Sequence, residues 1–369
     1  MSIDSDISYM RRALKLALKG AGWTSPNPMV GAVVALKSGT ILGEGYHRRF
    51  GAPHAEVEAL RNCDKALLKG ASLYVNLEPC CHHGKTPPCA DALIEAGLSR
   101  VVIAMQDPNP MVSGKGIDIL QRAGVKVEIG LGALEAFELN RAYVKYHKTG
   151  LAWCHIKIAL SLDGKIADHR GRSKYFSGAK ALKYAHLLRS QCDAILVGRR
   201  TIEIDDPQLN VRLVKGRNPI RLVLSAKGQI DREKKVFAPQ DERAAILLTG
   251  GRRRTKDVAF QTDKIIFPLN DVSRIHTRQI LVALPRLGIL SVLVEGGAEV
   301  LSRFMQDDAI DELTIALSPT IIGKGLSPFE TFIPENWDNR PVFKLNRIKR
   351  LGEDVVMNYR RDGSICSPD

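Results

Sequence analysis

The residues with the clearest chemical potential are a histidine, two cysteines and a glutamate in the first quarter of the chain. His54 and Glu56 stand two positions apart, and Cys80 and Cys89 follow within the segment EPCCHHGKTPPC. One imidazole and two thiolates make a three-ligand zinc site that leaves a fourth position for water. Zinc lowers the pKa of bound water towards about 7, so hydroxide becomes available at neutral pH. An unligated carboxylate beside the metal can carry protons between water and substrate.

The spacing of His54 and Glu56 sets a condition on the local structure. On a regular helix, two residues that are two positions apart diverge by about 200°. Both side chains can therefore face one cavity only if His54 lies at the irregular start of a helix. Pro53, immediately before it, suits that position.

His-x-Glu followed by Pro-Cys and a second Cys is the signature of zinc deaminases. Here eight residues separate the two cysteines, where the compact form of the signature has two. Cys81, His82 and His83 could compete as ligands. There are two structural alternatives: a closed zinc site that only stabilises the loop, and a cluster of free thiols that binds no metal. A structural site would usually supply four protein ligands and has no need of Glu56, so we favour the open site.

The composition is that of a folded chain. The net charge is +14, with 44% hydrophobic and 25% charged residues, which excludes a disordered, collagen-like or disulfide-scaffold protein. Three of the seven cysteines fall within ten residues, which favours a metal over disulfides. Charges interrupt the apolar positions of segment 1–20, which predicts an amphipathic helix and not a signal peptide. No apolar run reaches the roughly 18 residues of a membrane helix, so we expect a cytoplasmic protein.

Short apolar runs alternate with segments of helical period, which predicts an α/β fold. In the first half we expect strands over 30–36, 73–77, 101–105 and 125–129, and helices over 55–68, 89–96, 114–123 and 133–147. In the second half we expect strands over 153–160, 194–197, 220–224, 244–248, 265–267 and 291–294, helices over 179–190, 274–284 and 298–306, and late, antiparallel strands over 311–317 and 355–359. The pattern breaks after residue 147, so we predict two domains, 1–147 and 148–369.

Further strings, together with the His54/Glu56 pair, cover nearly the whole chain and resemble one family. They are PNPMVG at 26–31, GEGYH at 43–47, segment 77–89, DPNP at 107–110, KIALSLDG at 157–164, HLLRS at 186–190, segment 193–201, DDPQL at 205–209 and segment 293–297. The chain resembles the bifunctional deaminase/reductases of bacterial riboflavin biosynthesis, in which the long spacing between the cysteines is a family trait. Cys81 departs from the family's serine, and Tyr175 and Phe176 depart from its Trp-Ile.

The resemblance implies a cytidine-deaminase-like N-terminal domain and a dihydrofolate-reductase-like C-terminal domain. The first would use one zinc ion per chain to deaminate 2,5-diamino-6-(5-phosphoribosylamino)pyrimidin-4(3H)-one by hydrolysis. The second would use NADPH to reduce the ribosyl side chain of 5-amino-6-(5-phosphoribosylamino)uracil to ribityl. The expected partner is a small phosphorylated pyrimidine, with no nucleic acid and no membrane, and the family is compatible with a homo-oligomer.

The resemblance also implies roles for individual residues. His54, Cys80 and Cys89 would hold zinc, and Glu56 would be the proton shuttle. The deaminase substrate would contact Asn27, His47, His82, Lys85, Thr86, Asp107 and Asn109. The reductase substrate would contact Lys157, Ser173, Arg189, Leu209, Arg212 and Glu295. NADPH would contact Ala159, Tyr175, Thr201, Asp205, Gly297, Ala298, Glu299, Val300, Leu301, Ser302 and Arg303.

General chemistry supports some of these roles and offers alternatives to others. Guanidinium groups bind oxyanions in a bidentate way, so Arg189 and Arg212 suit a phosphate, and ordinary ion pairs are the alternative. Strand 291–294 is followed by Glu295, two glycines and a helix, and a helix N-terminus favours phosphate. Asn27 and Lys85 also have purely structural alternatives, in which Asn27 forms a turn and Lys85 is an ordinary surface lysine.

Two other functions compete with the bifunctional enzyme. A deaminase that edits a polynucleotide would use the same zinc motif and the positive charge. It should interleave basic and aromatic residues in a groove, but aromatic residues make up only 6% of the chain and the strings at 157–164 and 293–297 would be unexplained. A non-catalytic zinc scaffold is opposed by Glu56 and by the three-ligand count.

Overall fold

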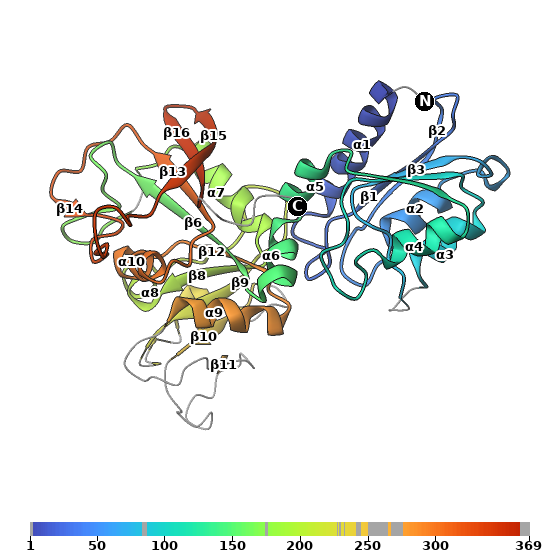
Figure 1. Cartoon of the computed structure of the whole chain (residues 1–369). Coiled ribbons are helices and arrows are strands. Elements are labelled where there is room, and N and C mark those ends of the chain that lie inside the picture. Colours follow the sequence, from blue (N-terminus) through green and yellow to red (C-terminus); the bar gives the residue numbers. More distant parts are fainter. Residues whose placement is uncertain are drawn as a thin grey trace. The chain divides into compact units, whose positions relative to one another are not determined.

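The chain forms two compact units, which divide between Gly150 and Leu151 (Figure 1). The computed structural model describes residues 3–82, 87–173, 176–226, 228, 230–231, 233–240, 245–249, 265–266 and 276–361, with the backbone alone for 265–266. We predicted the boundary after residue 147. Helix α6 (Arg141–Thr149) continues past that point and ends at Gly150, whose left-handed φ of 73° suits a helix C-terminus.

The N-terminal unit is built on a five-stranded sheet with the spatial order β2-β1-β3-β4-β5. The strands are β1 (Gly31–Ala35), β2 (Ile41–Tyr46), β3 (Ser72–Val75), β4 (Arg100–Ile103) and β5 (Lys126–Ile129). β1 is antiparallel to β2 and β3, whereas β3, β4 and β5 run parallel. The other helices are α1 (Ile3–Ala17), α2 (Ala55–Arg61), α3 (Cys89–Glu95), α4 (Lys115–Arg122) and α5 (Ala133–Leu139), with 3-10 turns at Leu18–Gly20 and Lys65–Leu67.

Alternate residues of these strands supply two apolar layers. Val34 and Leu73 belong to the cluster with α2, α3 and α4. Their sequence neighbours Val33 and Tyr74 belong to the cluster with α1, α5 and α6. Because successive side chains of a strand point to opposite faces, the sheet is covered on both sides.

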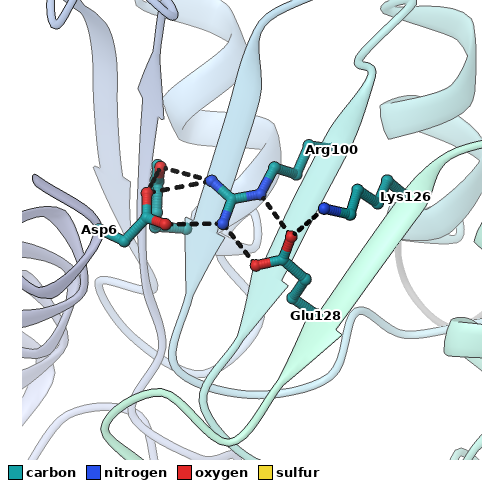
Figure 2. A network of polar contacts seen from close by, with 5 residues as sticks. Asp6, Arg100, Lys126 and Glu128 are labelled. Carbon is teal, nitrogen blue, oxygen red and sulfur yellow. Dashed lines mark hydrogen bonds and ion pairs between the residues drawn. The ribbon is translucent and has the colours of Figure 1, made fainter. Parts of the chain in front are cut away.

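A partly exposed ion-pair network ties α1 to this sheet (Figure 2). The guanidinium of Arg100, on β4, donates to both carboxylate oxygens of Asp6, on α1, at 3.0 and 2.7 Å. Its Nε donates to Glu128, on β5, at 3.0 Å, and Lys126 pairs with the same carboxylate at 2.7 Å. The network therefore joins three elements that are distant in sequence.

The C-terminal unit contains a nine-stranded sheet with the order β11-β10-β9-β8-β12-β6-β13-β16-β15. Its strands are β6 (Trp153–Leu160), β8 (Ala194–Gly198), β9 (Ile220–Leu224), β10 (Ile246–Leu248), β11 (Ile265–Ile266), β12 (Ser291–Val294), β13 (Glu312–Leu317), β15 (Phe343–Leu351) and β16 (Asp354–Arg361), and β7 (Ala167–Asp168) pairs with β14 (Gly325–Leu326). The sheet is parallel from β11 to β13 and antiparallel from β13 to β15.

Helices cover both faces of this larger sheet. They are α7 (Ala179–Gln191), α8 (Arg199–Asp205), α9 (Thr277–Ala283) and α10 (Ala298–Gln306), with 3-10 turns at Lys235–Phe237 and Leu284–Leu287. Val292 and Val294 of β12 pack with α9 and α10, whereas Leu293 between them packs with α7. The parallel core with helices on both sides is the α/β arrangement that the sequence pattern predicts.

Several predicted elements have the predicted bounds, and others were missed. Strands 153–160, 220–224 and 291–294 and helix 298–306 are observed as predicted, and β13 and β16 pair antiparallel. The predicted helix 133–147 is two helices that meet at Asn140. β2, β15 and α8 were not predicted. In β2 the strand pattern is broken by Gly43 and Gly45, and a Cβ on Gly45 would lie 2.3 Å from the Ala55 carbonyl oxygen of α2, so the glycine serves close packing.

Among the helices of the described residues, none has the length and apolar character needed to cross a membrane.

Candidate active sites

The three predicted zinc ligands converge in the N-terminal unit. His54 Nδ1 lies 3.2 Å from Cys89 Sγ and 3.4 Å from Cys80 Sγ. The three donor atoms all lie within 4.8 Å of one another, and they are the one such group found among the described residues. A nitrogen and two sulfurs at these separations fit a zinc ion with bonds of about 2.0–2.3 Å and an open fourth position.

The local structure at His54 is the one that the spacing of His54 and Glu56 requires. His54 is the N-cap of α2, with an extended backbone (φ −73°, ψ 161°), and Glu56 lies in the first helical turn. The prediction of an irregular helix start is therefore confirmed. Glu56 is buried, and burial raises its pKa to about 7. Its carboxylate interacts with the Cys89 thiol, so it lies beside the donor set without belonging to it.

The two cysteines are held together by the backbone. The Cys89 N–H donates to Cys80 Sγ at 3.3 Å, and the Ala90 N–H donates to the Cys80 carbonyl oxygen at 3.2 Å. The Cys89 thiol and His54 both lower the pKa of Cys80, while burial opposes them. Cys80 is therefore disposed to be a thiolate, the form that binds metal.

Two of the competing ligands, Cys81 and His82, are not part of this group. Cys81 Sγ points to the Met111 carbonyl oxygen, at 3.8 Å, and His82 is exposed. His83 lies outside the described residues, as do the predicted substrate residues Lys85 and Thr86.

Asn27 and His47 contact each other beside the predicted metal ligand His54. Their side chains lie 3.2 Å apart, from Asn27 Nδ2 to His47 Nε2. His47 Nδ1 lies 3.0 Å from the Pro53 carbonyl oxygen, which can only accept, so Nδ1 donates and Nε2 accepts. Burial lowers the pKa of His47, which agrees with this neutral tautomer. The His47 ring meets that of His54 edge-on, with centroids 5.5 Å apart.

Asp107 and Asn109 form a second pair of predicted substrate residues, after β4. The Asn109 N–H donates to Asp107 Oδ1 at 2.8 Å. Tyr143, on α6, donates from its hydroxyl to the same carboxylate, at 3.0 Å from Oδ1. Burial raises the pKa of Asp107 to about 6, although both hydrogen bonds oppose the rise. The structure thus adds Tyr143 to this side of the site.

In the C-terminal unit, three predicted substrate residues form a largely buried charged cluster. Arg189, on α7, donates to both oxygens of Glu295 at 2.9 and 2.7 Å, and its Nη1 donates to the Asn210 carbonyl oxygen at 3.3 Å. Lys157, on β6, interacts electrostatically with Glu295 and Arg189, and burial lowers its pKa. The guanidinium that we expected to suit a phosphate is thus engaged with Glu295, which leaves it fewer free N–H groups.

Arg212 is exposed and lies near this cluster through His186 and Asn210. The backbone N–H of Arg212 donates to His186 Nδ1 at 3.2 Å, and its side-chain Nη1 donates to Asn210 Oδ1 at 2.9 Å. Burial, together with the charges of Arg189 and Arg212, lowers the pKa of His186 to about 4, so its ring is neutral at pH 7.

Two other predicted substrate residues have different surroundings. Ser173 donates from Oγ to Asp205, a predicted cofactor residue, at 3.1 Å. Leu209 has a left-handed φ of 52°, and its side chain packs in the core with Ile195 and Ile202. A ligand contact at Leu209 would therefore have to come from the backbone.

Thr201, Gly297 and Ala298, three of the predicted cofactor residues, lie near the carboxyl ends of two adjacent parallel strands. β8 leads into α8, which carries Thr201, and β12 leads into α10, whose N-cap is Gly297. A Cβ on Gly297 would lie 3.8 Å from Thr201 Oγ1, so the two helices begin side by side. Helix N-termini at such a position suit the phosphates of a nucleotide.

Three later residues of the predicted cofactor run, Val300, Leu301 and Ser302, are buried. Val300 and Leu301 pack in the core of the unit, and Ser302 accepts the Thr331 N–H at 3.2 Å. Arg303 pairs with Glu299 at 2.7 Å. A cofactor would therefore meet Gly297, Ala298 and the backbone of the first turn before these side chains. Ala159 is half-buried on β6, and Tyr175 lies outside the described residues.

Comparisons with known proteins agree with both units. The family model of the RibD C-terminal domain matches residues 152–357, and that of the cytidine and deoxycytidylate deaminase zinc-binding region matches residues 3–105. The riboflavin biosynthesis protein RibD of Aquifex aeolicus is 38% identical over 96% of this chain and 98% of its own length. That of Escherichia coli is 38% identical over 96% and 98%.

Solved structures agree along the whole chain. RibD of Acinetobacter baumannii has a TM-score of 0.88 at 33% identity, covering 97% of this chain and 99% of its own. A diaminohydroxyphosphoribosylaminopyrimidine deaminase/5-amino-6-(5-phosphoribosylamino)uracil reductase of Thermotoga maritima has a TM-score of 0.85 at 37% identity, with the same coverage. The fold predicted from the resemblance, a deaminase domain followed by a reductase domain, is confirmed. The chain therefore belongs to the RibD family of riboflavin biosynthesis proteins.

Proposed function

We propose that the chain catalyses two consecutive reactions, one in each unit. The N-terminal unit deaminates 2,5-diamino-6-(5-phosphoribosylamino)pyrimidin-4(3H)-one by hydrolysis. The C-terminal unit then reduces the ribosyl side chain of 5-amino-6-(5-phosphoribosylamino)uracil to ribityl with NADPH. The donor set of His54, Cys80 and Cys89 with the buried Glu56 beside it carries the proposal, and the name of the Thermotoga maritima relative states both activities.

Glu56 is the residue to which we assign the proton transfers of deamination. His54, Cys80 and Cys89 would hold a zinc ion, which would act as a Lewis acid and lower the pKa of water in the site towards about 7. The Glu56 carboxylate takes a proton from the attacking water and returns it to the departing amine. Because Glu56 is buried at the start of α2 beside Cys89, it is held where both transfers can occur.

We assign the pyrimidine and ribose to Asn27, His47, Asp107 and Asn109, and the phosphate to His82, Lys85 and Thr86. The hydrogen bond with His47 orients the Asn27 amide, and its carboxamide oxygen makes no hydrogen bond to the described residues, so it can accept one from the substrate. Tyr143 and the Asn109 N–H hold Asp107 from two sides. A rigid contact surface of this kind lowers the entropic cost of binding.

In the C-terminal unit we assign the reductase substrate to Lys157, Ser173, Arg189, Leu209, Arg212 and Glu295. NADPH supplies the hydride when it is bound, and the starts of α8 and α10, with Thr201 and Gly297, suit its phosphates. The Lys157 ammonium makes no hydrogen bond to the described residues, so it can donate to a substrate oxygen. Arg212, which is exposed, is better placed than Arg189 to bind the substrate phosphate.

We further propose that the chain acts in the cytoplasm on this small phosphorylated substrate and uses no nucleic-acid partner. A homo-oligomer is compatible with every assignment above.

The test is to measure ammonia release, NADPH oxidation and zinc content on one sample with the phosphorylated diaminopyrimidinone as substrate. We expect both activities at about one zinc per chain, the count that a single three-ligand site implies. Ammonia release without NADPH oxidation would contradict the assignment of the C-terminal unit. If zinc were bound but neither activity appeared, the proposal would fail, and a polynucleotide substrate would be the next to test.

A further inference from the structure

Glu78 is a buried carboxylate that no cation balances among the described residues. It lies between β3 and Cys80 and is 3% exposed. Four backbone N–H groups donate to it. Its Oε2 accepts from Asp107 at 3.1 Å and Gly114 at 3.0 Å, and its Oε1 accepts from Gly116 at 3.0 Å and Ile117 at 3.3 Å. Four N–H groups that converge on one carboxylate hold its position and tie it to the backbone that carries them.

These four donors belong to one segment, which runs from the end of β4 into the first turn of α4. The same segment carries Asp107 and Asn109, two of the residues to which we assign the substrate. The first N–H groups of a helix lack partners within the helix and favour an anion, and Glu78 fills that need for α4. The backbone N–H of Glu78 also donates to the Met105 carbonyl oxygen, at 3.0 Å.

The stretch between Glu78 and the metal ligand Cys80 lies directly against α4. A Cβ on Gly116 would come within 2.1 Å of the Pro79 carbonyl oxygen, so only glycine permits this approach. Cys80 itself has further supports, since its carbonyl oxygen and its sulfur both accept backbone N–H groups from α3. Loss of the Glu78 carboxylate would therefore loosen the segment 107–117, which carries Asp107 and Asn109, more than it loosens Cys80.

We propose that Glu78 is a positioning residue for deamination, which fixes Asp107 and Asn109 at a set distance from the metal ligand Cys80. It does so through the backbone of the segment 107–117 and touches neither zinc nor substrate. This inference rests on the proposed deaminase function of the N-terminal unit.

The test compares Glu78→Gln with Asp6→Asn in the full-length, zinc-loaded chain. Both changes turn a buried or half-buried carboxylate into an amide, but Asp6 pairs with Arg100, away from the segment 107–117. For Glu78→Gln we expect the KM for the diaminopyrimidinone to rise by about 10- to 100-fold, the range for residues that orient ligating and binding groups. Zinc content and reduction of the deaminated substrate should not change. Hydrogen exchange should accelerate at the amides of Asp107, Gly114, Gly116 and Ile117.

Three results would overturn the inference. The first is an unchanged KM in a folded Glu78→Gln chain. The second is a KM that rises equally in Asp6→Asn at an equal loss of melting temperature, because the effect would then be general destabilisation. The third is a loss of zinc in proportion to activity, because Glu78 would then secure the metal ligand and not the substrate segment.

Two further controls keep the test decisive. If Glu78→Gln does not fold, Glu78→Asp keeps the charge and shortens the side chain by one methylene, and its KM should also rise. A wild-type chain that releases no ammonia would refute the proposed function, and this inference with it. If the wild-type chain is active and the KM of the Glu78 variants is unchanged, this inference alone is refuted.

Discussion

The side chain of Asn140 pairs with the backbone of Met29 as one strand pairs with another. Asn140 Oδ1 accepts the Met29 N–H at 2.8 Å, and its Nδ2 donates to the Met29 carbonyl oxygen at 3.0 Å. The pair spans 111 residues and joins the junction of α5 and α6 to the loop that carries Asn27. The carbonyl oxygen also accepts from Asn76 Nδ2, at 3.0 Å, so the Met29 N–H depends on Asn140 more than the oxygen does.

Asn140→Ala should therefore destabilise the N-terminal unit and weaken substrate binding. The substitution leaves the Met29 N–H without its acceptor in a partly buried place, where the cost should lie towards the lower end of the roughly 1–3 kcal/mol of a fully buried unsatisfied donor. The measurement is chemical denaturation together with the deaminase KM. Asn62→Ala removes a comparable side-chain-to-backbone hydrogen bond at an exposed site and should cost much less. Equal losses in the free energy of unfolding in the two variants would show that the Asn140–Met29 hydrogen bonds contribute no more to stability than an exposed one.

Replacement of Glu56 should separate the two activities. Glu56→Gln keeps the shape of the side chain but cannot take up a proton, so ammonia release should fall by about 10²- to 10⁴-fold, the usual contribution of a general acid–base. The same sample should still oxidise NADPH when it receives the deaminated intermediate, because the reductase residues lie in the other unit. Loss of both activities in a folded chain would contradict two independent sites.

The carboxyl group of Asp107 should make stability depend on pH. Burial raises its pKa from an ordinary 3.8 to about 6 in the folded chain. The folded state then holds the proton more tightly than the unfolded state, so this contribution to stability is complete below about pH 4 and is lost as the pH rises through about 6. Asp107→Asn, which is neutral throughout and keeps Oδ1 as an acceptor, should be relatively more stable at pH 8 than at pH 4.5. Two pKa units correspond to about 3 kcal/mol at most.

The control for Asp107 is an acid whose pKa moves the other way. The hydrogen bond with Arg100, against an opposing effect of burial, lowers the pKa of Asp6. Its contribution to stability is present above its ordinary pKa and is lost as the pH falls. Asp6→Asn should thus destabilise the chain more at pH 8 than at pH 3. Thermal melts of both variants across this range check the two signs, and a shared pH trend would refute the assignment to Asp107.

Local patterns were enough to predict most of the strands and to pick out the three candidate zinc ligands that converge in the structure. His54, Cys80 and Cys89 have strong chemical identities, and the extended start of α2 follows from the need for His54 and Glu56 to face one cavity. Strand β6 was predicted to the residue because its sequence is mostly apolar, interrupted only by His155 and Lys157, and mostly apolar segments are typical of strands in a parallel sheet.

The supports of the site could not be predicted because they depend on tertiary structure. Tyr143 acts on Asp107 across 36 residues, and Asn140 interrupts a helical pattern that is otherwise continuous. In the sequence, Glu78 stands out only as the first residue of the cysteine segment. Its hydrogen-bond donors lie on the segment that leads into α4. For Asn140 a usable signal exists, since a polar residue within an apolar helical face is often a buried hydrogen-bonding group.

The last prediction concerns Glu295, which compensates two cations in the C-terminal unit. Burial alone would raise its pKa, but the charge and hydrogen bonds of Arg189, with a smaller effect of Lys157, lower it to about 2. Glu295→Gln would leave Arg189 buried without its counter-ion, and breaking a buried pair in this way costs about 3–5 kcal/mol. NADPH oxidation should fall together with the stability of the C-terminal unit. Ammonia release should continue, because the residues assigned to deamination lie in the other unit.

Glu203→Gln is the matched control, because Glu203 pairs with Arg199 at the same 2.7 Å but in an exposed position. It should cost less than about 1 kcal/mol. The difference between the two variants in the free energy of unfolding should also depend on pH. Glu295 has a lowered pKa, so its contribution is complete above its ordinary 4.5 and declines as the pH falls towards 2. Unfolding measured at pH 7 and pH 3 should therefore show the Glu295→Gln penalty shrinking in acid. A penalty of equal size at both pH values would mean that packing, and not the buried charge of Arg189, sets the cost.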